Sequence, residues 1–315
     1  MKIVIVGAGA TGGYFGAKLA QAGRAVEFLV REKRAAALRE RGLRVVSPGG
    51  ASIVQLQPEV VTAAELAAAA AAGRAVPADT VLLTVKAAGL GAAIDEVRPA
   101  VGPDTTIVPV LNGMRHLDML NTTFGGPRVL GGVAVLATQL DGDGDVVAYN
   151  DAASLTIGAQ DGQRTDAVER TRQLLDGAGF QVAVSDDILA AMWAKWAFIA
   201  SVGAATCLLG GTAGEITAAG GAPVARAIVA EAYQVAAAAG YPVPAADEER
   251  TGAMLTEAGS PFASSMYRDL RQGRPVEVDT ILADLTARGR AHGVSTPLLD
   301  AAVTALRIHN DRLTR

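Results

Sequence analysis

Residues 1–23 read MKIVIVGAGATGGYFGAKLAQAG, and this stretch decides the fold. The run Ile3–Val6 is apolar and β-branched throughout, which is typical of a strand buried on both faces of a parallel sheet. Gly7, Gly9 and Gly12 follow with G-x-G-x-x-G spacing, and apolar residues then recur at helical spacing. A strand, a glycine turn and a helix in this order predict a site where the pyrophosphate of a dinucleotide rests on a helix N-terminus.

The three glycines have different expected roles. Gly7 permits the tight turn, Gly9 lets phosphates approach the backbone, and Gly12 lets the helix pack closely on the strand. A tight turn without a ligand would use glycine in the same way, but the position directly after an N-terminal buried strand favours the dinucleotide. The predicted cofactor-binding loop comprises Gly7, Ala8, Gly9, Ala10, Thr11 and Gly12.

The composition of the chain limits its classes of function. Its 315 residues are enough for two domains. The formal net charge is -4, so the composition implies no broad basic surface for nucleic acid. The single cysteine, Cys207, leaves no internal disulfide and fits a reducing compartment. The apolar start is too short for a signal peptide and is broken by glycines, so the expected location is the cytoplasm.

One later stretch has the length and the apolar character of a membrane span. Residues 188–209 carry a single charge, Lys195, which would be costly near the middle of a bilayer. Asp186 and Asp187 precede the stretch, where a basic flank would be expected. A helix that is apolar all round can also be the central helix of a large protein. We therefore expect a buried helix and no membrane partner.

The first half of the chain alternates predicted strands and helices, which is typical of a doubly wound α/β sheet. Residues 43–61, with a Pro-Gly-Gly turn at 48–50, predict a hairpin beside that sheet. The predicted strands cover 3–6, 25–30, 80–85, 105–111, 129–138, 146–149, 154–157 and 181–184. The predicted helices cover 12–21, 34–41, 62–72, 90–97 and 116–121.

After Asp187 the strand pattern disappears, and helical patterns follow one another between Gly and Pro breaks. They predict helices over 188–209, 223–239, 245–258, 276–292 and 297–312. The chain therefore divides near residue 186 into an α/β domain and an all-α domain. Where two such domains abut, the carboxyl ends of the strands face the helices, and we expect the ligand site in that cleft.

The residue that ends the second strand distinguishes NAD from NADP. An acid there bonds the ribose 2′-hydroxyl, whereas a basic residue accommodates the 2′-phosphate. The strand AVEFLV is followed by Arg31, with Lys33 and Arg34 close behind, and a guanidinium fork suits phosphate. An exposed loop charge is the alternative, and Glu32 is the one acid nearby. The sequence therefore predicts NADP.

Two later strands also end in polar residues. The run VLLTVK ends in Lys86, which is expected to be a cofactor ligand or a solvated loop lysine. The run TTIVPVLNGM places Asn112 before Gly113. Asn-Gly often marks a hairpin, but a helical pattern follows here, so the turn is expected to open into the cleft with Asn112 as a cofactor or substrate ligand.

Lys195 is the strongest single indication of chemistry. It stands between Trp193 and Trp196 in the apolar helix, where an uncompensated ammonium would be unfavourable. A lysine in such surroundings changes its pKa readily and can serve as a proton donor, although a buried ion pair would also explain it. The three histidines stand in unrelated contexts, and no metal site is expected.

A third cluster, FASSMYRDLRQGRPVEVDT, spans residues 262–280. Ser264 and Ser265 precede a short helical pattern and would suit a helix N-cap or a ligand site. Glu277 begins the next helical pattern, where the helix dipole favours an acid. Together with Lys195, these side chains could supply hydroxyl, carboxylate and ammonium groups to one cleft.

These motifs, taken in order, resemble those of the ketopantoate reductase (2-dehydropantoate 2-reductase) family over nearly the whole chain. The matching segments are GAGATG at 7–12, Arg31, TVKA around Lys86, LNGM around Asn112, MWAKW around Lys195, SSMYRD at 264–269 and EVD at 277–279. The resemblance implies a Rossmann-type NADP-binding domain over residues 1–186. It also implies a helical domain over 187–315, like the C-terminal domain of 6-phosphogluconate dehydrogenases, for substrate binding and dimerisation. A homodimer through the helical domain is left open.

The resemblance implies NADPH-dependent reduction of a 2-keto acid, with ketopantoate as the leading named substrate in pantothenate biosynthesis. Lys195 would protonate the keto oxygen, Asn112 would touch nicotinamide and substrate, and Ser265, with Ser264, would bind the substrate carboxylate. The remaining carried-over positions are Glu277 near the nicotinamide ribose, and Lys86 and Ala137 along the cofactor.

The chain departs from the family pattern where polar residues are expected for the far end of the substrate. Asparagines are replaced by Ile199, Gly203, Ala213 and Phe262, and an Asn-Gly pair by Leu282–Ala283. If ketopantoate is the substrate, its hydroxyl needs other partners, such as Ser201, Thr206 or water. A more apolar 2-keto acid is the alternative substrate. A non-catalytic NADP-binding sensor and a β-hydroxyacid dehydrogenase are the alternative functions.

Overall fold

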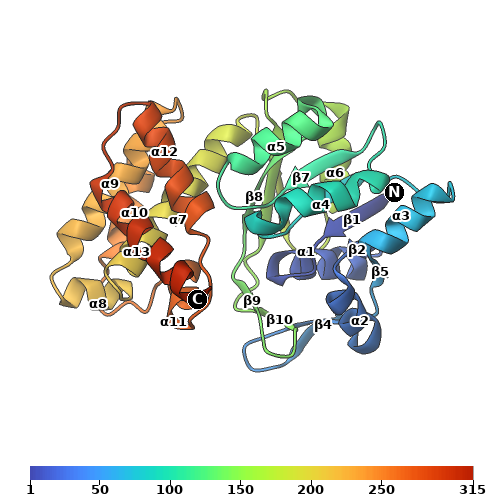
Figure 1. The fold of residues 1–315 in the computed structure, drawn as a ribbon, viewed down its shortest axis with the longest axis horizontal. Coiled ribbons are helices and arrows are strands. Elements are labelled where there is room, and N and C mark those ends of the chain that lie inside the picture. The colour runs from blue at the N-terminus through green and yellow to red at the C-terminus, as the bar shows by residue number, and fades with distance from the viewer. Residues whose placement is uncertain (315) are drawn as a thin grey trace. The chain divides into compact units, whose positions relative to one another are not determined.

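The structure, a computed structural model, describes residues 1–314 and forms two compact units (Figure 1). Unit 1 comprises Met1–Leu111 and His116–Ile188. Unit 2 comprises the short segment Asn112–Arg115 and the chain from Leu189 onward. Unit 1 carries the strands and unit 2 is helical, which confirms the predicted combination of an α/β domain with an all-α domain.

Unit 1 is built on a five-stranded parallel sheet in the order β5-β2-β1-β6-β7. The central strand β1 is flanked by β2 and β6, so that Ile5 pairs with Phe28 on one side and Leu82 on the other. The strands are β1 (Lys2–Val6), β2 (Ala25–Leu29), β5 (Glu59–Val61), β6 (Thr80–Leu83) and β7 (Thr106–Pro109). The connecting helices are α1 (Ala10–Gln21), α2 (Glu32–Arg41), α3 (Ala63–Ala71), α4 (Leu90–Val97) and α5 (Arg115–Phe124).

Two smaller sheets complete unit 1 and correct two predictions. The predicted strand 129–138 is two strands, because β8 (Leu130–Val135) pairs with β11 (Ser154–Ala159), whereas β9 (Thr138–Leu140) pairs with β10 (Val146–Ala148). The predicted hairpin is shorter than 43–61. The hairpin consists of β3 (Leu43–Val46) and β4 (Ser52–Leu56) only. Strand β5 lies beside β2 at the edge of the parallel sheet. Pro58 separates β4 from β5, since proline cannot donate to a strand ladder.

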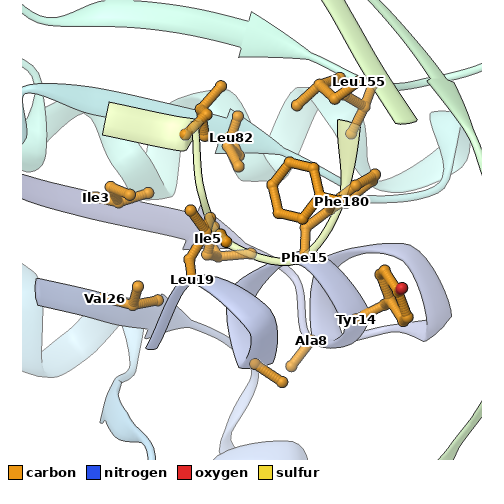
Figure 2. Packing of buried hydrophobic residues seen from close by; sticks show 14 of the residues in the cluster. Ile3, Ile5, Ala8, Tyr14, Phe15, Leu19, Val26, Leu82, Leu155 and Phe180 are labelled. Carbon is orange, nitrogen blue, oxygen red and sulfur yellow. The ribbon is translucent and has the colours of Figure 1, made fainter. Parts of the chain in front are cut away.

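The core of unit 1 lies between α1 and the strands (Figure 2). Phe15 of α1 packs edge-on against Phe180, with ring centroids 4.8 Å apart. Gly16, one residue further, leaves room for the Phe28 ring, which a Cβ at position 16 would approach to 2.3 Å. Full burial of a phenylalanine contributes about 1.5–3 kcal/mol, so this close approach of helix to sheet stabilises the unit appreciably.

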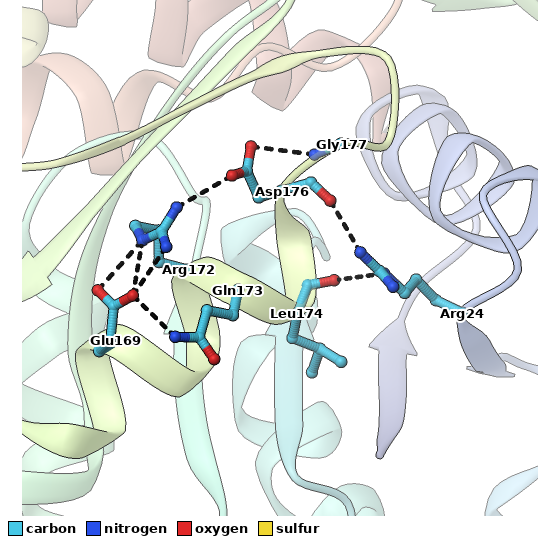
Figure 3. Close-up of polar contacts among 7 residues, drawn as sticks. All are labelled: Arg24, Glu169, Arg172, Gln173, Leu174, Asp176 and Gly177. Atoms are coloured by element: carbon cyan, nitrogen blue, oxygen red, sulfur yellow. Dashed lines mark hydrogen bonds and ion pairs between the residues drawn. The ribbon is translucent and has the colours of Figure 1, made fainter.

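Helix α6 (Asp166–Leu175) was not predicted from the sequence, and a distant arginine completes its C-terminus. The Nε of Arg24 donates to the Leu174 carbonyl at 3.0 Å, and its Nη2 donates to the Asp176 carbonyl at 2.9 Å (Figure 3). These bonds satisfy carbonyls that a helix end leaves without intrahelical partners. Arg172 forms ion pairs with Glu169 on the same helix and with Asp176 at its C-cap. Strand β12 (Gln181–Val184) follows and pairs with β11.

Unit 2 contains no strand between Leu189 and Thr314. The predicted helix 276–292 is a π-helical turn at Asp279–Ala283 that continues into α12. Its α-helices are α7 (Ile188–Leu208), α8 (Ala213–Ala218), α9 (Ala222–Ala238), α10 (Ala245–Leu255), α11 (Ser265–Arg271), α12 (Asp284–Ala291) and α13 (Pro297–Leu313). Helix α7 is long and apolar enough to cross a membrane, but 61% of its apolar window is buried inside the protein, as expected for a core helix.

Candidate functional site

The glycine turn between β1 and α1 is fixed by a contact from another strand end. Gly7 has φ +96°, a conformation that glycine adopts without steric cost. The Thr84 Oγ1, just after β6, lies 2.9 Å from the Val6 carbonyl oxygen and 2.8 Å from that of Gly7. A Cβ at position 12 would lie 2.1 Å from the Gly7 carbonyl oxygen and 2.2 Å from the Thr84 Oγ1, so only glycine fits there.

The N-terminus of α1 is open toward the turn. Gly9 is its N-cap, and among residues 1–314 no side chain caps the first N–H groups of the helix. A Cβ at position 9 would meet no described atom within 4 Å beyond its chain neighbours. Uncapped N–H groups at the positive end of a 12-residue helix are a ready site for an anionic group. The loop therefore fits the pyrophosphate of a dinucleotide.

The residues after β2 and β6 lie together at the same edge of the sheet. Arg31 is the N-cap of α2, and its exposed side chain extends toward the loop after β6. Its Nη2 lies 3.6 Å from the position that a Cβ of residue 89 would take. Lys86 is exposed and precedes the 3₁₀ turn Ala87–Gly89. The structure thus brings the Arg31 side chain close to the turn that follows Lys86.

Arg34 contacts the glycine turn, although nothing in the sequence distinguishes it from the neighbouring Lys33. Its Nε donates to the Ala8 carbonyl at 3.1 Å, which ties α2 to the glycine turn. Ala137 lies in the connection from β8 to β9 and is partly buried, and its carbonyl accepts the Tyr149 N–H at 2.9 Å. This bond gives the Ala137 backbone a structural role.

Lys195 lies on α7 beside two buried tryptophans, Trp193 and Trp196. Its side chain is partly buried, and burial lowers its pKa from 10.5 to about 8. The Trp193 and Trp196 rings lie 4.9 Å apart at their centroids, and the Arg288 guanidinium lies over both. The Trp196 Nε1 donates to the Ile281 carbonyl in the π turn at 2.8 Å, which fixes the helix beside the lysine. A lysine with such a pKa can exchange a proton near neutral pH.

The face of α7 that carries Lys195 becomes apolar further along the helix. Ile199 and Gly203 follow Lys195 at intervals of four residues and therefore share its face. A Cβ at position 203 would lie 2.9 Å from the Sδ of Met266, a residue that is 4% exposed. The thioether of Met266 therefore occupies the space above Gly203, where a longer side chain would otherwise project.

The serine and threonine hydroxyls near this face already have partners. The Ser264 Oγ accepts the Tyr267 N–H at 2.9 Å as the N-cap of α11, and it lies 2.8 Å from the Thr206 Oγ1. The Thr206 Oγ1 also donates to the Val202 carbonyl at 2.7 Å. The Ser201 Oγ donates to the Ala197 carbonyl at 2.7 Å. Ser265, the first residue of α11, is exposed.

Ser201 and Thr206 are 0% exposed. This burial, together with their internal bonds, argues against the expectation that Ser201 and Thr206 receive a substrate hydroxyl.

Two other predicted ligands, Asn112 and Glu277, are neighbours in the chain of residues that form or contact the π turn. Gly113, with φ +80°, packs so closely that a Cβ there would lie 2.6 Å from the Thr280 carbonyl oxygen. Helix α5 begins at Arg115, so the Asn-Gly pair is followed by a helix and not by the second strand of a hairpin.

Glu277 immediately precedes the helical segment, and its carbonyl accepts the Ile281 N–H at 3.2 Å. A residue that the sequence did not single out fixes its backbone. Asn310 of α13 bonds both the N–H and the carbonyl of Val276, at 3.0 and 2.9 Å. No group of three or more His, Cys, Asp or Glu side chains in the described chain is arranged to hold a metal ion.

Comparison with known proteins gives matches over both units. The family model described as ketopantoate reductase PanE/ApbA matches residues 3–162, and the model described as its C-terminal domain matches residues 187–310. The chain is 31% identical over 310 residues to an uncharacterized oxidoreductase, YkpB, of Bacillus subtilis, covering 98% of this chain and 99% of that protein.

It is also 30% identical over 331 residues to a 2-dehydropantoate 2-reductase of Mesorhizobium japonicum, covering 98% of this chain and 97% of that protein. Among solved structures, D-mandelate dehydrogenase with NADH and anilino(oxo)acetate superposes with a TM-score of 0.85. That match covers 100% of this chain and 99% of the other at 23% identity, and it shows likeness of fold alone.

Proposed function

The chain belongs to the ketopantoate reductase family, and from this premise we propose that it is an NADPH-dependent reductase that converts a 2-keto acid to a 2-hydroxy acid. Membership makes it an oxidoreductase of a family that reduces 2-keto acids. The proposal adds the cofactor, the residues and a location in the cytoplasm. Residues 1–186 would bind the cofactor, and residues 187–315 would bind the substrate and provide a dimer surface.

The observation that carries the proposal is the lowered pKa of Lys195, about 8, on a core helix otherwise composed of uncharged residues. When bound, NADPH supplies a hydride to the carbonyl carbon of the keto acid. The Lys195 ammonium donates its proton to the keto oxygen, so that a hydroxyl forms while lysine becomes neutral. Neutral lysine then recovers a proton from water. A pKa near the working pH suits both steps.

The residues of unit 1 fit the cofactor. The open N-terminus of α1 beside Gly9 would hold the pyrophosphate, and Arg31 would pair with the ribose 2′-phosphate. Lys86 and Ala137 would line the cofactor. Asn112 and Glu277 would hold the nicotinamide ribose and orient the substrate, and Ser265 would bind the substrate carboxylate.

Two substrates follow from different observations. Ketopantoate is the named candidate because of the family and its Mesorhizobium relative, and it would place the chain in pantothenate biosynthesis. A 2-keto acid with an apolar side chain is favoured by the Met266 thioether over Gly203 and by the buried, bonded Ser201 and Thr206 hydroxyls. Hydroxyls that are already bonded within the protein do not compensate the desolvation of a substrate hydroxyl.

The test is to follow NADPH oxidation with ketopantoate and with a panel of apolar 2-keto acids. Oxidation coupled to formation of the 2-hydroxy acid is expected. Tight NADPH binding without oxidation by any 2-keto acid would indicate a non-catalytic sensor. Turnover of 3-hydroxy acids in place of 2-keto acids would indicate a β-hydroxyacid dehydrogenase.

A further inference from the structure

The guanidinium of Arg34 is anchored on one side and unsatisfied on the other. Arg34 is the third residue of α2, and its Nε donates to the Ala8 carbonyl at 3.1 Å. A Cβ at position 144, in the turn between β9 and β10, would lie 2.7 Å from its Nη1. Its Nη2 is fully buried and has no hydrogen-bond partner among residues 1–314.

The charges around Arg34 leave an excess of positive charge. Asp145 lies close enough to act on Arg34 electrostatically, but its Oδ2 accepts a hydrogen bond from the Arg44 Nη1 at 2.7 Å. Two guanidiniums therefore share one carboxylate, which is 9% exposed. Burial lowers the pKa of Arg34, because the surroundings solvate its charge poorly.

A buried donor without a partner is unfavourable by roughly 1–3 kcal/mol, and more when the group is charged, so such a group calls for an explanation. Asp145 does not supply that partner, since its Oδ2 accepts from Arg44 and no hydrogen bond joins it to the Arg34 Nη2. The Ala8 carbonyl places Arg34 beside Gly9, where the backbone is open. Arg31, the proposed partner of the 2′-phosphate, stands three residues earlier. An anion at this point would satisfy the Nη2 donor and balance the charge.

We propose that Arg34 is a second ligand of the ribose 2′-phosphate of NADPH, acting together with Arg31. This inference rests on the proposed function. The Nε bond to Ala8 holds the guanidinium plane against the glycine turn, and the Nη2 donates to a phosphate oxygen. An arginine fixed in this way loses little side-chain freedom when the phosphate binds, so its bond adds to both affinity and selectivity.

The test is a titration of the full chain, wild type and Arg34→Gln, with NADP⁺, NAD⁺, 2′,5′-ADP and 5′-AMP by calorimetry. Loss of one charge-assisted bond is expected to weaken NADP⁺ and 2′,5′-ADP by about ten- to a hundred-fold. Binding of NAD⁺ and 5′-AMP should stay within about three-fold. Arg41→Gln is the matched control, because Arg41 lies on the same helix and donates to the Asp143 carbonyl of the same turn. It should change none of the four affinities.

An equal loss for NADP⁺ and NAD⁺ in Arg34→Gln would overturn the inference and make Arg34 a residue that only positions the loop. Unchanged NADP⁺ binding would overturn it as well. If Arg34→Gln does not fold, Arg34→Lys keeps the charge but lacks the fork, and it should still lower NADP⁺ affinity selectively. The proposed function fails separately, if the wild-type chain binds no NADP⁺ or reduces no 2-keto acid.

Discussion

The glycine turn of unit 1 and the Lys195 face of unit 2 differ in how strictly the structure restricts their residues. At the turn, a side chain at position 12 would collide with the Gly7 backbone and with Thr84, so the residue type is fixed by sterics. On the α7 face, Gly203 is accompanied by a methionine that fills the space above it. The proposed cofactor loop is therefore restricted by backbone contacts, whereas the proposed substrate face on α7 is shaped by the packing of side chains.

The largest effect on catalysis should come from replacing Lys195, the one charged residue of α7. Lys195→Ala is expected to lower kcat for keto acid reduction by about a hundred-fold or more, the usual contribution of a general acid. The NADPH dissociation constant should change little, which fluorescence titration would check. If the variant loses stability but keeps its rate per folded molecule, the lysine is structural, and the chemistry must be sought elsewhere.

A substitution in unit 1, near the glycine turn, should change the preference between NADPH and NADH. Arg31→Glu is expected to shift the NADPH-to-NADH preference by about ten- to a hundred-fold, because it replaces a phosphate partner with a repelling charge. The ratio of kcat/KM for the two cofactors measures this shift. Arg39→Glu on the same helix is a control, since Arg39 pairs with Glu65 and is remote from the glycine turn in sequence. Unchanged selectivity in Arg31→Glu would refute the assignment of the phosphate site.

The pH dependence should report the surroundings of Lys195. The lysine donates a proton only when charged, and its pKa is lowered from 10.5 to about 8. We therefore expect kcat/KM for reduction to be level below pH 8 and to fall about ten-fold per pH unit above it. Oxidation of the 2-hydroxy acid needs neutral lysine and should rise through the same pH. A reduction profile that stays level to about pH 10 would contradict this role.

The smallest expected effect is on substrate preference, and it concerns the apolar part of the α7 face around Gly203. We expect the ratio of kcat/KM for ketopantoate to that for its analogue lacking the 4-hydroxyl to be about one or lower, because the Ser201 and Thr206 hydroxyls are buried and already bonded within α7. A site built to bond the hydroxyl could favour ketopantoate by roughly 10⁴-fold, and a ratio approaching that value would establish ketopantoate as the substrate. Gly203→Asn combined with Met266→Ala restores an amide and the space for it, and should raise the ratio.

The sequence by itself determined the fold class and supplied the residues proposed for the candidate site. The apolar run Ile3–Val6 and the G-x-G-x-x-G spacing indicated a parallel sheet because burial and turn formation are local properties of the chain. A charged residue in an apolar helix singled out Lys195 for the same reason. The strand 129–138 was wrong because apolar character does not reveal that a strand changes partners at residues 136–137.

The tertiary structure alone decided which polar groups are free and which are already used. The Thr84 contact with the glycine turn, the Met266 thioether over Gly203 and the Ser264–Thr206 pair all join segments that are distant in sequence. The unsatisfied Nη2 of Arg34 also arises from packing, because segments distant in sequence bury it without a hydrogen-bond partner in the described chain. Residue spacing predicts which side chains share a helix or strand face, but hydrogen-bond partners and lowered pKa values arise only when distant segments pack together.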